Sequence, residues 1–133
     1  MLPAQHKLNS SAQFRATMKK GRRAGSNHVV VHLWDSAESV DGAGAQGEIS
    51  VSGGPRFGLI VSKAVGNAVL RHRTSRRLRH ICARITADSP ELLRPTHQVV
   101  IRALAGSAEV SSAELDREIR RNLKKASRVR QSR

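Results

Sequence analysis

The segment 56–84 concentrates side chains that bind phosphate. It reads RFGLIVSKAVGNAVLRHRTSRRLRHICAR and holds eight Lys or Arg residues, with no carboxylate between Glu48 and Asp88. An arginine guanidinium binds a phosphate group through two parallel hydrogen bonds and stacks on nucleic-acid bases. Arginines on a solvated helix face commonly pair with glutamates one turn away, and here there are none. The segment therefore predicts a site for a polyanion, and we expect that polyanion to be RNA.

The histidines and carboxylates form no recognisable catalytic or metal-binding pattern. The six histidines lack HxxxH spacing and have no acidic cluster beside them. No Ser-His-Asp arrangement, P-loop or pair of carboxylates occurs. The sequence itself favours a binding protein with no catalytic residue and no metal ligand of its own.

The composition also favours nucleic acid over other partners. The 133 residues carry a formal charge of +14, which attracts anionic partners and weakens folding through self-repulsion. No run approaches the roughly 18 apolar residues of a membrane span, and the first residues, MLPAQHKLNSS, lack the apolar stretch of a signal peptide. The one cysteine, Cys82, is expected to be a buried thiol. We expect a cytoplasmic protein with no membrane and no small-molecule substrate.

The elements that would position these residues form an α+β fold. Ser10 or Ser11 can cap a helix that runs to about Lys20, and a long helix is expected from the Gly66-Asn67 turn to about Ala87. A last helix follows a capping box at Ser111 and Glu114. Strands are expected at 28–34, 57–63 and 97–104. The order is α-β-β-α-β-α with a possible extra strand, which predicts helices packed on a small mixed sheet in a two-layer α/β sandwich.

Side-chain alternation assigns faces to these elements. In the first strand Val29, Val31 and Leu33 share one face, and His32 lies on the other. In the long helix an apolar side opposes a basic one. The apolar side is expected to hold Leu70, Thr74, Leu78, Ile81 and Ile85, and the basic side His72, Arg76 and Arg79.

The domain organisation is expected to be simple. Residues 1–125 would form a single RNA-binding domain. Within it, residues 35–55 hold four of the ten acids and five of the ten glycines, which is typical of a mobile, solvated loop. Residues 126–133 are predicted to form a basic, disordered tail.

Two further features have alternative interpretations. Phe14 and Met18 lie four residues apart on one helical face, either as core or as a stacking platform beside a nucleic-acid groove. The turn at Gly66-Asn67 precedes a helix N-terminus, whose free amides favour phosphate, although many helices begin this way. Lys63, just upstream, favours the phosphate interpretation.

The central segment resembles the signature of the bacterial ribonuclease P protein subunit. The residues that carry the resemblance run from Arg56 to Arg79 and read RxGLxVSKxxGNAVxRxRxxRxxR. The early helix with Phe14, the strands HVVVHLW and HQVVIRA, and the capped last helix follow in that family's order. The sequence departs from the common pattern at His72, where an asparagine is usual, and at Ala64, where a lysine is usual. Met18 and His32 stand where aromatic residues are common.

The resemblance implies a fold, partners and residue roles. The family folds as an α/β sandwich with a left-handed βαβ crossover, like a domain of a ribosomal protein. Its members bind ribonuclease P RNA and precursor tRNA, and the RNA, with Mg²⁺ held by RNA and substrate, removes the 5′ leader. Transferred by position, the leader-binding residues would be Phe14, Met18 and His32. The contacts to the catalytic RNA would be Lys63, Asn67, Arg71, Arg73, Arg76, Arg77 and Arg79. The alternative function is a ribosomal or RNA-chaperone protein without an enzymatic role, which the charge alone fits equally well.

Overall fold

Three helices pack on one four-stranded sheet. The computed structural model describes residues 11–35, 55–93 and 96–131. The elements follow as α1 (Ser11–Lys20), β1 (Arg22–Gly25), β2 (Val29–Asp35), β3 (Arg56–Ile60), the 3-10 turn η3 (Lys63–Val65), α3 (Ala68–Asp88), the 3-10 turn η4 (Pro90–Leu92), β4 (His97–Ala103) and α4 (Ser112–Gln131). The α+β class predicted from the sequence is confirmed.

The sheet is mixed and has the strand order β1-β2-β4-β3. β2 is antiparallel to both of its neighbours, while β3 and β4 are parallel and are joined through α3. The βαβ unit that the resemblance implies is therefore present. β4 is central, as its nearly continuous apolar sequence suggests.

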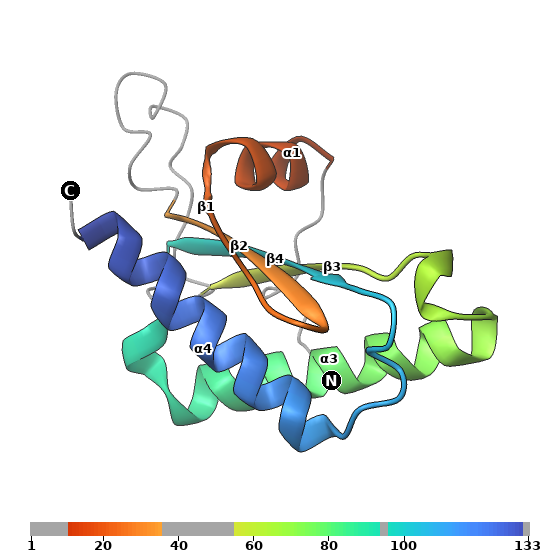
Figure 1. Cartoon of the computed structure of the whole chain (residues 1–133). Helices are drawn as coiled ribbons and strands as arrows, with labels where there is room; N and C mark the ends of the chain where they lie inside the picture. The colour runs from red at the N-terminus through yellow and green to blue at the C-terminus, as the bar shows by residue number, and fades with distance from the viewer. Residues whose placement is uncertain (1–10, 36–54, 94–95, 132–133) are drawn as a thin grey trace.

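The helices occupy both faces of the sheet, with α1 on one side and α3 and α4 on the other (Figure 1). The core lies between the sheet and the α3/α4 layer. It includes Val29, Val31 and Leu33 of β2 and the alternate residues Val99 and Ile101 of β4. The face assignment made from alternation is thus confirmed, and His32 lies on the α1 side.

Each long helix is fixed by its cap and its apolar stripe. The Asn67 side chain accepts a hydrogen bond from the Leu70 N–H at 3.0 Å, and Ser111 Oγ accepts from the Glu114 N–H at 3.1 Å. α3 buries Thr74, Leu78, Ile81, Cys82 and Ile85. α4 buries Leu115, Ile119, Leu123 and Ala126. No helix in the described ranges is long and apolar enough to cross a bilayer.

Three features differ from the sequence-based expectations. β1 adds a strand before the first expected one, because Arg22–Gly25 pairs with Val30–Leu33 of β2. β3 ends at Ile60 because Ser62 caps the η3 turn instead of extending the strand. The tail predicted from residue 126 is wrong up to Gln131, since α4 continues there and Ala126 is buried in the core. Most of the expected mobile loop, residues 36–54, lies outside the described residues, as do 132 and 133.

Candidate nucleic-acid interface

The outer side of α3 presents a basic face. Its exposed members are His72, Arg73, Arg76, His80 and Arg84. Among the described residues, Arg84 reaches Asp116 at 3.5 Å, whereas Arg73 and Arg76 form no ion pair. Two uncompensated guanidinium groups on a rigid helix are available for phosphate. Their spacing of three residues places them on adjacent turns of the same side.

A shallow cavity of about 300 Å³ lies between the first turns of α3 and the end of β3. Arg71, Ser75 and Arg79, four residues apart in succession, contribute to its wall together with Val61, Ala68 and His72. The Nε atom of Arg71 is buried and has no hydrogen-bond partner within the protein. An anion in this cavity would meet two guanidinium groups and a hydroxyl. Ser75 and His72 were not predicted as site residues, although the spacing of four from Arg71 to Ser75 to Arg79 was visible in the sequence.

The entry to α3 has a defined backbone shape. Gly66 adopts φ of 147°, a conformation that other residues rarely take, and a Cβ there would also lie 2.6 Å from Leu70 Cδ1. Lys63 is exposed on η3, while Asn67 uses its side-chain oxygen for the helix cap. Of these two predicted RNA contacts, Lys63 is an exposed cation, whereas Asn67 is neutral and has its side-chain oxygen engaged in the cap.

Arg77 differs from the other arginines of α3. Its Nε donates to Ser112 Oγ at 3.0 Å, one terminal nitrogen donates to the Ala108 carbonyl at 3.4 Å, and the other donates to the Val110 carbonyl. Burial, and then the charge of Arg73, lower the pKa of Arg77 below its usual value. The side chain thus ties α3 to the segment that leads into α4. The sequence grouped it with the RNA contacts because this partner lies more than 30 residues away.

The other predicted site lies on the α1 side of the sheet. A Cβ added to Gly58 would stand 2.3 Å from Phe14 Cζ, so the phenyl ring rests directly on the β3 backbone. Thr17 Oγ1 donates to Gln98 Oε1 at 3.3 Å. Phe14 and Met18 are both half-buried. This half-burial is compatible with either interpretation of the pair, core or platform.

His32 lies on the same sheet face and is only 7% exposed. Its Nδ1 atom is buried without a hydrogen-bond partner. Burial lowers the pKa of His32 first, and the charges of Arg23 and Arg102 lower it further. Both effects favour the neutral ring, and its Nδ1 atom makes no hydrogen bond within the described protein.

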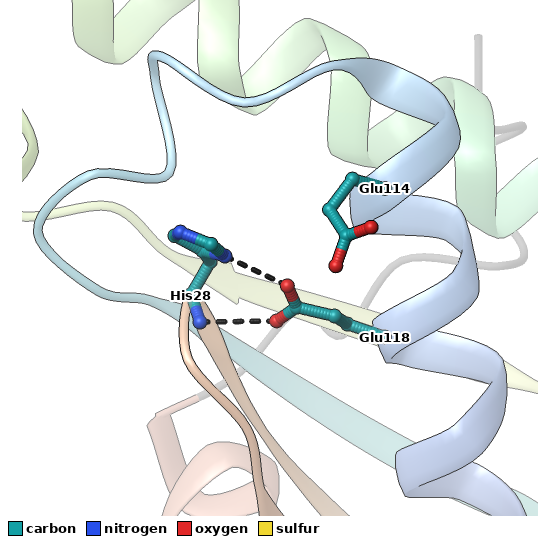
Figure 2. Close-up of side chains that lie close together, drawn as sticks. All are labelled: His28, Glu114 and Glu118. Atoms are coloured by element: carbon teal, nitrogen blue, oxygen red, sulfur yellow. Dashed lines mark hydrogen bonds and ion pairs between the residues drawn. The ribbon is translucent and has the colours of Figure 1, made fainter.

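A histidine and two glutamates meet on the opposite side of the sheet, where α4 approaches the β1–β2 turn (Figure 2). Glu118 Oε2 lies 2.7 Å from His28 Nδ1, and Glu118 Oε1 accepts from the His28 backbone N–H and the Ser26 hydroxyl at 3.0 and 2.6 Å. Burial alone would raise the pKa of Glu118, but these hydrogen bonds lower it to about 2. The cluster thus joins α4 to the turn through hydrogen bonds that occupy both oxygens of one carboxylate.

Comparison with known proteins agrees with this fold. Curated relatives called "Ribonuclease P protein component" include one from Corynebacterium efficiens, 76% identical over 130 residues, and one from Corynebacterium glutamicum, 75% identical over 130 residues; each alignment covers 98% of both chains. Solved RNase P proteins from Staphylococcus aureus and Thermotoga maritima share the fold, with TM-scores of 0.67 and 0.63 at 22% and 17% identity. These alignments cover 91% and 92% of this chain and 94% and 96% of the solved chains. The family model described as Ribonuclease P matches residues 2–127. This chain belongs to the ribonuclease P protein family.

Proposed function

We propose that this protein is the protein subunit of ribonuclease P and that the basic face of α3 holds the catalytic RNA. The observation that carries the proposal is the set of guanidinium groups on α3 that no carboxylate of the described chain neutralises. Arg73 and Arg76 supply exposed charge, and Arg71 and Arg79 supply a cavity for a phosphate group. Lys63 extends this surface toward β3. Asn67 caps the start of α3 and so helps to position this basic surface.

The substrate has a separate place on the protein. We infer that the sheet face beside α1 receives the single-stranded 5′ leader of precursor tRNA, in contact with Phe14, Met18 and His32. The half-buried phenyl ring of Phe14 supports this assignment, because bases stack on aromatic rings whatever their sequence. The imidazole of His32, whose Nδ1 atom has no partner in the described protein, would supply a hydrogen bond to a base or ribose.

We assign the cleavage of the phosphodiester bond to the RNA subunit. Mg²⁺ held by RNA and substrate would activate the water that attacks the phosphodiester bond. The donor set at His28, Glu114 and Glu118 does not suit Mg²⁺, which prefers oxygen ligands alone, and Glu118 already uses both oxygens within the fold. The protein's own residues therefore bind and orient the two RNAs. The holoenzyme would act in the cytoplasm, on precursor tRNA.

Reconstitution with bacterial ribonuclease P RNA tests the function. At low Mg²⁺ concentration, the protein is expected to accelerate removal of the 5′ leader from precursor tRNA relative to the RNA alone, because its cations replace part of the charge screening that metal ions provide. Cleavage no faster than with RNA alone would overturn the proposal. A ribosomal or chaperone protein of equal charge serves as the matched control and should leave the rate unchanged.

A further inference from the structure

The histidine and two glutamates beside the β1–β2 turn form a donor set for a transition metal. His28 Nδ1, one oxygen of Glu114 and one oxygen of Glu118 all lie within 4.8 Å of one another (Figure 2). One imidazole nitrogen and two carboxylate oxygens are ligands that Zn²⁺ takes in proteins, whereas Mg²⁺ and Ca²⁺ take oxygen alone. His28 and Glu118 are 90 residues apart in the sequence, so no spacing motif marks the set.

The carboxylate of Glu118 is already held in the orientation that a metal ligand needs. The residue is 1% exposed. Its Oε1 atom accepts hydrogen bonds from the Ser26 hydroxyl and the His28 backbone N–H, at 2.6 and 3.0 Å, which leaves Oε2 facing the imidazole at 2.7 Å. Hydrogen bonds to a ligand from groups outside the coordination sphere fix its position and raise metal affinity. Zn²⁺ between Oε2 and Nδ1 would replace one hydrogen bond and keep the two at Oε1.

Glu114 completes the set from one turn earlier on α4. Its side chain is half-buried, and its Oε1 atom pairs with Arg117 at 3.1 Å. A hydrogen bond with Glu114 is among the causes that lower the pKa of Glu118, so the two carboxyl groups are in contact. Two carboxylates repel each other unless a positive charge lies between them, and a divalent cation supplies that charge. Zn–N and Zn–O bonds of about 2.0–2.2 Å set tetrahedral ligand atoms about 3.3 Å apart, which a small rotation of the Glu114 side chain achieves.

A cavity of about 150 Å³ opens beside the two carboxylates. Ser26, Glu114 and Glu118 contribute to its wall. It gives an ion a path from solvent and gives a water molecule room to act as fourth ligand. Arg121 and Lys125 also line the cavity, but both are exposed, so solvent and salt screen their charges.

We propose that His28, Glu114 and Glu118 bind one Zn²⁺ ion, with water as the fourth ligand. The imidazole coordinates through Nδ1 and carries its proton on Nε2. The ion joins the β1–β2 turn to the first turns of α4 and so has a structural role. This site is separate from the Mg²⁺ that serves cleavage, and it does not depend on the proposed function.

Zinc titration of the free, full-length protein tests the site. After treatment with a chelator, calorimetry with ZnCl₂ should give one bound ion per chain, and MgCl₂ at the same concentrations should give no heat of binding. Bound Zn²⁺ should raise the melting temperature by several degrees, because the assembled site exists only in the native state. Co²⁺ in place of Zn²⁺ should show the visible absorption of a tetrahedral centre, which a cluster held by hydrogen bonds alone does not produce.

Two variants remove ligands from the site. Glu114→Gln replaces a carboxylate by an amide of the same shape that suits the same capping-box position, so α4 should stay folded. His28→Gln removes the nitrogen ligand. Each should weaken Zn²⁺ binding by at least about tenfold, since even outer-shell partners of a metal contribute that much. His80→Gln is the matched control, because His80 is exposed on α3 outside the cluster, and it should keep wild-type affinity.

Each result of these titrations supports or overturns the zinc site. Absence of a Zn²⁺ binding heat in the wild-type protein would overturn it. Equal affinity of the wild type, Glu114→Gln and His28→Gln would place the ion on other histidines and would also overturn it. If circular dichroism shows that His28→Gln does not fold, Glu114→Gln alone gives the answer. Failure of the protein to accelerate leader removal would overturn the proposed function and leave this inference unaffected.

Discussion

Arg77 donates hydrogen bonds to Ser112 and to the carbonyl oxygens of Ala108 and Val110, while Arg73, one turn earlier on α3, is exposed without an ion pair in the described chain. The two residues have the same chemistry and nearly the same helical position. Their roles diverge because the segment before α4 packs against only one of them. A guanidinium with three protein acceptors stabilises the fold, and one with none is available to a partner.

Substitution of the two arginines should separate these roles. Arg77→Gln is expected to lower the free energy of unfolding by about 1–3 kcal/mol, because backbone carbonyls lose their donor. Arg73→Gln should leave stability unchanged and reduce the log–log salt slope for catalytic RNA by about 0.9. Urea unfolding and RNA titration measure the two quantities. An exchange of the two phenotypes would contradict the structural assignment.

Glu118 makes the free energy of unfolding depend on pH in the acidic range. Its pKa is lowered to about 2, whereas an unfolded glutamate has a pKa of about 4.3. The hydrogen-bonded carboxylate therefore contributes fully above about pH 5, and this stability is lost as the pH falls through 4 toward 2, by on the order of 2 kcal/mol. Glu118→Gln should show a lower free energy of unfolding at neutral pH and a shallower decline with acid.

The control for this measurement is Glu109→Gln, because Glu109 is exposed and makes no ion pair within the described residues. It should follow the wild-type profile. Equal acid sensitivity of wild type and Glu118→Gln between pH 5 and pH 2 would show that the carboxylate does not supply the dependence.

At the scale of elements, the sequence predicted those whose own residues encode them. α3 has an apolar stripe of Thr74, Leu78, Ile81 and Ile85 and a side-chain cap, and both the helix and its faces are confirmed. β1 was missed because Arg22–Gly25 has no apolar alternation; it is a strand only because β2 offers an edge to pair with. The end of α4 was missed because its basic composition concealed a buried residue, Ala126, that continues the stripe.

The residues of the candidate nucleic-acid interface also differ in whether local sequence or long-range packing determines their position. The basic face of α3 was predictable, since exposure on a helix follows from spacing. The position of Arg23 and Arg102 beside His32 was not predictable, because it depends on the register of three strands that are distant in sequence. The tie from Arg77 to the α4 segment also depends on a long-range contact. Local patterns determine which side of an element a residue occupies, and tertiary packing determines what it meets.

The packing of α1 on the sheet depends on the absence of a side chain at Gly58. Gly58→Ala would place a methyl group within 2.3 Å of Phe14 Cζ, so the ring must leave the strand. We expect a loss of about 1–3 kcal/mol in the free energy of unfolding and a weaker preference for precursor over mature tRNA. In a Phe14→Ala background the same change should have little effect, because the clashing ring is absent. Additive losses in the double variant would contradict a direct contact.

At the scale of the whole molecule, basic side chains of α1 and of α3 lie on opposite sides of the sheet. The chain has a net charge of +14, and its core is built from Val, Ile, Leu and Ala with few aromatics. Repulsion between like charges opposes folding, so ligands that neutralise the charge should stabilise the native state. The α3 side would take the catalytic RNA and the α1 side the substrate leader.

Multivalent anions should therefore raise the melting temperature. Pyrophosphate at millimolar concentration is expected to increase it by several degrees beyond NaCl of equal ionic strength, because it binds the native arginine clusters. Thermal unfolding followed by circular dichroism measures the difference. A variant with Arg71→Gln and Arg79→Gln, which removes the cations of the α3 cavity, should lose part of the increase. An equal effect of pyrophosphate and NaCl would indicate general screening alone.

The two edge strands have a consequence for the protein before it meets any RNA. β1 is four residues long and begins with Arg22 and Arg23, and β3 is five residues long and begins with Arg56. Unpaired strand edges invite addition of strands from other copies and hence aggregation, and short edges with charged side chains resist this. The arginines that suit a polyanion thus also keep sheets of separate copies from joining edge to edge. Replacement of these arginines by apolar residues would lower the solubility of the free protein and would not improve the packing of its core.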